Sequence, residues 1–340
     1  GEFLYKVTSL DSVGGWISHL FQYVTGSLKD VTFEVFALED VKSADGESED
    51  YYKKDELVAT ITTDDTGIAK LSGLPLGKYY VKEKATVDGF VLDNEAREID
   101  LTYRDQDTAE VTYSADWQNN RQKAEVEVVK KEKDSDRVLE GAVFALCNKD
   151  DIVNAKGDVI LKADTVIEEL ATDKDGKLTF TADLPIGFEY YIKETSPAPG
   201  FATTDETQEF TFEYEGAEKE KVSSSFTFED EPTVIEITKT SLTDGKELEG
   251  AKLQVTDESG KVVDSWTSGK EAHIIKELVV GQKYTLTETK PADGFVTAES
   301  ITFTVKDNAE AQKIEMKDDV TKVEISKTDI SGKELTGAKL

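Results

Sequence analysis

Side chains that usually carry metal or nucleophilic chemistry are scarce in this sequence of 340 residues. It has one cysteine, Cys147, and two histidines, His19 and His273. A single cysteine excludes a disulfide framework and any site with several thiolate ligands. Two separate histidines leave no constellation for a zinc site or a Ser-His-Asp triad. We therefore expect no metal and no cofactor, and we expect Cys147 to be a small core residue.

Basic residues and long apolar runs are scarce as well. Lys and Arg total 40 against 71 Asp and Glu, so the formal net charge is −31. This balance excludes nucleic acid and anionic membrane surfaces as expected partners, because both attract Lys and Arg. No run approaches the roughly 20 apolar residues of a membrane helix, so we expect no membrane insertion in this segment. The hydrophobic content of 38% is patterned, which favours folded domains over disorder.

Internal repeats are the clearest feature that the sequence does have. Each repeat opens on a similar motif, in the order Leu28-Lys-Asp-Val-Thr-Phe33, Leu139-Glu-Gly-Ala-Val-Phe144 and Leu248-Glu-Gly-Ala-Lys-Leu253. A later motif ends on glutamate and precedes a Gly-Phe pair, in the order Tyr79-Tyr-Val-Lys-Glu83, Tyr190-Tyr-Ile-Lys-Glu194 and Tyr284-Thr-Leu-Thr-Glu288. A fixed internal period indicates repeated structural units.

The repeats predict three domains and part of a fourth. We expect the domains at residues 1–121, 122–232 and 233–320, and the first strand of a further repeat at residues 321–340. The opening motif recurs as Leu335-Thr-Gly-Ala-Lys-Leu340, where the chain stops. We therefore expect this chain to be a segment of a longer protein.

Within each repeat, apolar residues recur at every second position of short segments. Val126 and Val128 alternate with polar residues, and so do Phe210, Phe212 and Tyr214. Alternation over short runs predicts strands with one buried face. Turn dipeptides separate the runs, and the sequence has only six prolines and no long helical period. The predicted fold is all-β, a series of Ig-like antiparallel β-sandwiches, with a short helix near residues 162–170 as the one exception.

Charged residues lie in phase with the buried faces of several predicted strands. They are lysines on opening strands, glutamates on middle strands and aspartates on closing strands: Lys130, Lys239, Lys327, Glu194, Glu288, Asp230 and Asp318. Buried charges are costly unless they are paired or neutralised. Burial lowers the pKa of an amine and raises that of a carboxyl, so a neutral lysine could face a carboxylic acid.

Two interpretations of these residues are open. A neutral amine is a nucleophile, and a protonated glutamate beside it could serve as general acid and base. The product would be an amide between a lysine and an aspartate or asparagine, joining first strand to last. The alternative is a buried salt-bridge network, or lysines that extend their charged ends outward to solvent.

The order of lysine, then Glu-Thr-x-Pro-Ala-x-Gly-Phe, then aspartate resembles the B-type repeats of collagen adhesins (Cna-B) and SpaA-type pilins of Gram-positive bacteria. Thr195-Ser-Pro-Ala-Pro-Gly-Phe201 and Thr289-Lys-Pro-Ala-Asp-Gly-Phe295 carry the motif, with glycine at positions 187 and 281. The resemblance implies a prealbumin-like sandwich that forms an intramolecular isopeptide bond spontaneously. It also implies a wall-anchored stalk or fibre outside the cell.

Carried over residue by residue, the resemblance assigns one site to each complete repeat. In the second domain, Lys130 and Asp230 would form the bond and Glu194 would catalyse it. The third domain would use Lys239 and Asp318, with Glu288 as the catalyst. Because each site would react once, we expect a structural protein and not an enzyme. Its neighbouring repeats would be its first partners.

The first domain departs from this pattern. Glu83 holds the catalytic position. Lys6 is the only early lysine near a predicted strand, but it lies 13 positions further from its opening motif than Lys130 and Lys239 lie from theirs. For the acceptor we favour Asn119, in phase with Trp117, with Asn120 and Asp116 as alternatives.

Aromatic residues near the N-terminus suggest a second function. Trp16, Phe21 and Tyr23 fall within residues 14–24, whose spacing suits a short amphipathic helix. If exposed, they would form a patch that binds a host protein or an extracellular matrix ligand. If buried, they would simply cap the first sandwich.

Overall fold

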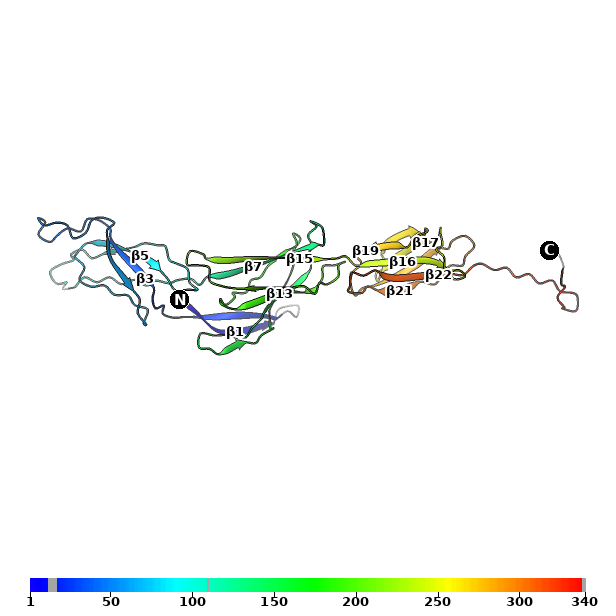
Figure 1. The fold of residues 1–340 in the computed structure, drawn as a ribbon, viewed down its shortest axis with the longest axis horizontal. Coiled ribbons are helices and arrows are strands. Elements are labelled where there is room, and N and C mark those ends of the chain that lie inside the picture. The colour runs from blue at the N-terminus through cyan, green and yellow to red at the C-terminus, as the bar shows by residue number, and fades with distance from the viewer. Residues whose placement is uncertain (12–16, 109, 338–340) are drawn as a thin grey trace. The chain divides into compact units, whose positions relative to one another are not determined.

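The structure is a computed structural model that describes residues 1–11, 17–108 and 110–337. The predicted all-β fold is confirmed, because the described residues form strands β1 to β22 and no helix (Figure 1). The same ranges therefore contain no helix that could cross a membrane.

The two predicted helices are wrong. Strand β2 (Ile17–Thr25) occupies most of the first, and β11 (Val166–Ala171) most of the second. Each pairs with a neighbour, β2 with β1 (Glu2–Asp11) and β11 with β8 (Val143–Asn148). Phe21 and Tyr23 are two positions apart, so the period of two describes this segment better than a helical period.

The described chain divides into two compact units, and the division passes through the second repeat. The first unit comprises residues 1–130, 143–195 and 205–228, and the second comprises residues 131–142, 196–204 and 229–340.

In the described residues, the first domain forms one sheet with the order β4-β3-β5-β6. The bounds are β3 (Thr32–Ala37), β4 (Leu57–Thr62), β5 (Lys78–Ala85) and β6 (Arg97–Asp100). Its buried face alternates along β3, where Phe33, Val35 and Ala37 form part of the core.

The second domain is a sandwich of two sheets, with the orders β11-β8-β13-β14 and β12-β7-β15, plus a small β10-β9 ribbon. The remaining bounds are β7 (Lys123–Glu132), β9 (Ile152–Val153), β10 (Val159–Leu161), β12 (Lys177–Thr179), β13 (Glu189–Ser196), β14 (Thr207–Thr211) and β15 (Lys221–Asp230). Phe144 and Phe228 meet in its core, with ring centroids 4.9 Å apart.

The third domain repeats the two-sheet arrangement, with the orders β18-β17-β20-β21 and β19-β16-β22. The bounds are β16 (Val234–Ser241), β17 (Lys252–Asp257), β18 (Val262–Thr267), β19 (His273–Lys276), β20 (Lys283–Lys290), β21 (Ile301–Thr304) and β22 (Gln312–Asp318). The first strand, β16, is central in its sheet and runs parallel to the last strand, β22. Parallel pairing of first and last strands brings their carboxyl ends to the same end of the sandwich.

The N-terminal hairpin β1-β2 is not part of the first domain's sheet. β2 pairs with β1 along its length and packs against β11 of the second domain. Asn154 of the second domain reinforces this packing, because its side-chain amide donates to the Tyr5 carbonyl at 3.2 Å. The sequence placed this segment in the first domain, where it would have supplied the first strand.

A Gly-Phe turn recurs at the end of each repeat. Gly89, Gly200 and Gly294 have φ angles of 91°, 91° and 89°, which glycine adopts without strain. Each glycine carbonyl accepts the backbone N–H of the residue that begins the next segment, from Gln122, Thr233 and Thr321 at 2.9, 3.0 and 2.9 Å. The turn therefore fixes where the following strand begins.

Candidate functional site

In the third domain the three predicted site residues meet in the core. Lys239 Nζ lies 3.0 Å from Glu288 Oε1, and it also contacts Asp318 Oδ1. The three residues are 2%, 4% and 1% exposed, respectively. They come from three strands, β16, β20 and β22, so the contact ties the first strand to the last across the core.

The strand register explains why these side chains converge. Lys239 follows Ile235 and Ile237 on the buried face of β16, as the alternation predicts. In the parallel ladder Lys239 lies opposite Met316, two residues before Asp318, so all three point to one side of the sheet. A lysine side chain is long enough to span that offset.

Burial dominates the electrostatics of the acceptor carboxyl. Burial raises the pKa of Asp318, the Lys239 charge opposes that rise, and the adjacent Glu288 carboxyl adds to it. Two carboxyls beside one lysine favour a state in which one of them holds a proton. An amine and two carboxyls are thus in contact in a buried site, and these are the functional groups that amide formation requires.

The second domain has the same residue types in the same strands. Lys130 Nζ lies 3.1 Å from Glu194 Oε1, and both side chains are completely buried. The Phe144 ring lies beside the amine, with its centroid 5.5 Å from Nζ. Asp230 is 2% exposed at the end of β15, the strand that neighbours β7 in the sheet order.

The first domain brings together the acid and the acceptor without a lysine. Asn119 Nδ2 donates to Glu83 Oε1 and Oε2 at 2.7 and 2.8 Å, and both residues are buried. Burial raises the pKa of Glu83. Lys6 is exposed on β1, and no lysine of the described ranges contacts this pair. The alternative acceptors Asn120 and Asp116 are both exposed.

One component of the site was missed in the sequence. The backbone N–H of Asp93 donates to Glu83 Oε2 at 2.9 Å, and that of Ala298 donates to Glu288 Oε2 at 2.8 Å. Each donor follows its glutamate by ten residues. The constant spacing of ten residues could have indicated this hydrogen bond in the sequence. The donor, however, is a backbone N–H, which nearly every residue type has, so no particular amino acid marks its position. In the third domain the bond leaves the other carboxyl oxygen, Oε1, beside the Lys239 amine.

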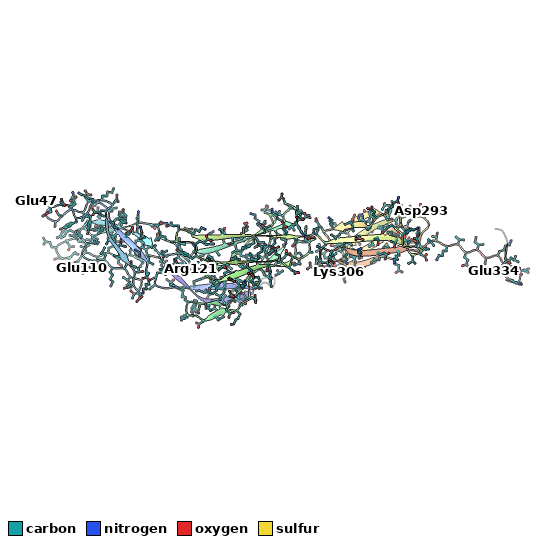
Figure 2. All side chains as sticks on the ribbon, in the orientation of Figure 1. Glu47, Glu110, Arg121, Asp293, Lys306 and Glu334 are labelled. Atoms are coloured by element: carbon teal, nitrogen blue, oxygen red, sulfur yellow. The ribbon has the colours of Figure 1, made fainter. Side chains whose placement is uncertain are left out.

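The predicted aromatic patch is not exposed where the structure describes it. Phe21 is 4% exposed, and the Tyr23 hydroxyl donates to the Asp183 carbonyl at 2.9 Å. The Arg121 guanidinium (labelled in Figure 2) lies over the Tyr23 ring, 3.2 Å from its centroid, and 2.5 Å from Asp183 Oδ2. Trp16 lies outside the described residues. Phe21 and Tyr23 therefore hold the hairpin against the second domain.

Arg121→Ala is expected to release this hairpin. The change removes a largely buried charged hydrogen bond and the stacking on Tyr23, together about 2 kcal/mol. Amide hydrogen exchange in β1 and β2 should become about thirtyfold faster, with exchange in the third domain unchanged. Arg104→Ala, at an exposed position, is the matched control. Equal exchange in the two variants would mean that Arg121 does not hold the hairpin.

Cys147 and the histidines do not form a site in the described residues. Cys147 is buried, and burial raises the pKa of its thiol. His273 stacks on Trp266 with ring centroids 4.0 Å apart and bonds Asp264 at 2.8 Å. No group of three or more His, Cys, Asp or Glu side chains in the described ranges is arranged to hold a metal.

Comparison with solved structures finds several chains that are similar to this one. The Bacillus anthracis TIE protein is 27% identical, with a TM-score of 0.53, and the match covers 89% of this chain and 54% of that one. This chain thus spans about half the length of that protein. BcpA, the major pilin subunit of Bacillus cereus, is 15% identical over 86% of this chain and 95% of its own, with a TM-score of 0.39.

A third similar structure is the shaft pilin SpaA of Lactobacillus rhamnosus GG. It is 16% identical over 60% of this chain and 100% of its own, with a TM-score of 0.28. No curated protein matches the chain.

The sequence profile of one domain family matches the chain three times, at residues 22–117, 124–225 and 233–320. These matches cover most of the chain, and the family is described as the SpaA prealbumin-like fold domain. The resemblance seen in the sequence is confirmed. The chain belongs to the SpaA prealbumin-like fold domain family and contains three tandem copies of that domain.

Proposed function

We propose that this chain is a stalk segment of an adhesin or pilin-like protein on the surface of a Gram-positive bacterium. Its second and third domains would each be closed by an autocatalytic Lys–Asp isopeptide bond. The protein would be secreted and anchored to the cell wall through parts of a longer polypeptide. Its chemistry would be one self-crosslinking event per domain and not the turnover of a substrate.

The buried cluster of Lys239, Glu288 and Asp318 is the observation that carries this proposal. A buried ion pair of this kind gives little net stability, because desolvation offsets the attraction. A covalent bond between the same atoms removes both charges from the core. Formation of an amide bond therefore explains better than a permanent salt bridge does why these three charged residues are buried.

The reaction follows from the positions of the three side chains. The neutral Lys239 amine attacks the carboxyl carbon of Asp318, while protonated Glu288 donates a hydrogen bond to a carboxyl oxygen of Asp318. Glu288 then accepts a proton from the attacking nitrogen and returns one to the leaving hydroxyl. A C–N bond forms, a C–O bond breaks, and water leaves.

The intact mass of the folded chain tests the proposal. Each Lys–Asp amide lowers the mass by about 18 Da, so two bonds give a deficit of about 36 Da. Lys239→Met and Lys130→Met should each restore about 18 Da. Lys252→Met, at an exposed position, is the control and should restore nothing. A wild-type chain with the full unreacted mass would contradict the proposal.

A further inference from the structure

In each domain, the loop after the glutamate of the predicted site pairs with the chain just after the predicted acceptor. We call this segment the acid–acceptor loop, and it comprises residues 84–93, 195–204 and 289–298 in the three domains. The phenylalanine of its Gly-Phe turn forms an isolated antiparallel bridge. The bridged pairs are Phe90 with Arg121, Phe201 with Pro232, and Phe295 with Val320.

Two backbone hydrogen bonds flank each of these bridges. One is the bond to the glycine carbonyl described above. In the other, the residue after the phenylalanine donates its N–H to the carbonyl of the residue after the acceptor. The donors and carbonyls are Val91 and Asn120 at 2.8 Å, Ala202 and Glu231 at 3.0 Å, and Val296 and Asp319 at 2.9 Å. The three domains therefore share one register between this loop and the acceptor strand.

The bridge also has a constant position relative to both side chains of the site. Each phenylalanine follows its glutamate by seven residues, and each bridge partner follows the acceptor by two. Residues two apart on an extended chain point to the same side, so the bridge determines the direction of the acceptor side chain. In the first domain, the residue two positions before Arg121 is Asn119. The alternatives Asn120 and Asp116 have a different register.

The far end of the same loop returns to the glutamate. In the third domain, the Ala298 N–H that donates to Glu288 Oε2 lies two residues after the Val296 N–H that bonds the acceptor strand. The first domain repeats this spacing, with Val91 bonding the strand and Asp93 bonding the acid. Two N–H groups separated by one residue thus hold the acid and the acceptor strand together.

Because these contacts are made by backbone atoms, the loop sequence can vary. Residues 289–291 are Thr-Lys-Pro, whereas residues 84–86 are Lys-Ala-Thr. Both loops nevertheless close the turn in the same way, since the phenylalanine N–H donates to the carbonyl three residues earlier, at 3.1 and 3.2 Å, respectively. Asp293, labelled in Figure 2, lies in this turn of the third domain. The loops therefore share a spacing and not a set of side chains.

Asp318 depends on this support because it is the last residue of its strand. The ladder between β16 and β22 ends where Ser241 lies opposite Asp318. The next backbone hydrogen bonds along the chain are those of the bridge, at the Asp319 carbonyl and the Thr321 N–H. The acceptor is thus held by the ladder on one side and by the acid–acceptor loop on the other.

We propose that the acid–acceptor loop is a positioning element for isopeptide formation, in which its two N–H groups align the glutamate carboxyl with the acceptor. This inference rests on the self-crosslinking proposed above. In the third domain the positioning residues are Val296, which acts through the acceptor strand, and Ala298, which acts through Glu288. A misplacement of reacting groups by about 1 Å slows a reaction by about a hundredfold. Loss of either N–H should slow linking by about that factor.

Proline substitutions in the full-length chain test the proposal, because proline has no N–H. Ala298→Pro removes the donor to the acid, and Val296→Pro removes the donor to the acceptor strand. Thr297→Pro is the matched control, since Thr297 is exposed and its N–H donates to no backbone carbonyl within the described ranges. Chains made by cell-free translation are quenched at intervals, and peptide mapping by mass spectrometry gives the fraction in which Lys239 and Asp318 are linked.

Ala298→Pro and Val296→Pro should each lengthen the half-time of linking in the third domain by about a hundredfold. The bond of the second domain, in the same chains, should form at the wild-type rate. Thr297→Pro should stay close to the wild-type half-time, and so should Ala298→Gly, which retains the N–H. A purely structural role would lower the melting temperature of the third domain and leave the rate of linking unchanged. That result, or equal slowing by Thr297→Pro, overturns the proposal.

Two further measurements separate the remaining outcomes. Cooperative thermal unfolding shows whether the third domain of each proline variant is folded. If it is not, an α-hydroxy acid incorporated at residue 298 replaces the amide by an ester and removes only the N–H, and linking at the wild-type rate would then overturn the proposal. A wild-type chain that never links refutes the proposed self-crosslinking itself. A wild-type chain that links, with variants that link equally fast, refutes only the role of the loop.

Discussion

Replacing Glu288 by alanine is expected to leave Lys239 and Asp318 unlinked and to lower the stability of the third domain by the full contribution of the bond. The bond would close a loop whose ends are 79 residues apart. By analogy with disulfides, closing such a loop lowers the entropy of the unfolded chain and contributes about 4–5 kcal/mol. The variant should be heavier than wild type by about 18 Da after allowing for the substitution itself.

Thermal unfolding of the third domain, followed by calorimetry, measures the stability part of this prediction. A loss of that size in a domain of about 90 residues lowers the melting temperature by roughly 20 °C or more. Glu299→Ala, at an exposed position in the same domain, is the control. A Glu288→Ala chain that keeps the full deficit of about 36 Da would show that another group catalyses the reaction.

Phe144→Ala is expected to destabilise the second domain and to slow its crosslinking. Phe144 is completely buried and packs on Phe228, so its truncation costs about 3–5 kcal/mol through lost contacts and the cavity left behind. The same cavity lies beside the Lys130 amine. Water that enters it stabilises the charged ammonium, which does not attack a carboxyl.

The matched control is Phe144→Leu, because the third domain has Leu253 at the corresponding position of the opening motif. This variant should lose less stability and should still crosslink. Peptide mapping of freshly purified chains would give the fraction in which Lys130 and Asp230 are linked. Equal linked fractions in the two variants would mean that packing of residue 144 beside the Lys130 amine does not control the reaction.

The fold and most of the candidate site could be predicted because both depend on a period of two. The phase of Lys239 with Ile235 and Ile237 placed the amine inside the sandwich, and the structure agrees. The phase of Asn119 with Trp117 likewise indicated the residue that meets Glu83. Local alternation determines which face of a strand a side chain occupies, whatever the strand pairs with.

The pairing partners of a strand could not be predicted in the same way. Alternation in β2 was compatible with a place in the first domain, and only long-range contacts decide that it pairs with β1 and packs on β11. The decisive contacts join Tyr23 to Asp183 and Arg121, which are distant in sequence. Lys6 was therefore assigned to a sandwich whose Glu83 and Asn119 it does not reach.

The parallel pairing of β16 and β22, together with the proposed bond between them, determines how the third domain responds to a pulling force. Its two ends leave along parallel strands, so a pull shears the ladder and loads its hydrogen bonds together. If Lys239 is bonded to Asp318, the force passes through that bond, and the chain between these two residues, which are 79 positions apart, does not extend. That segment would otherwise release roughly 270 Å of extended chain. The third domain would then have a nearly fixed contour length. It could not unfold under force and refold afterwards, as a domain without the bond does.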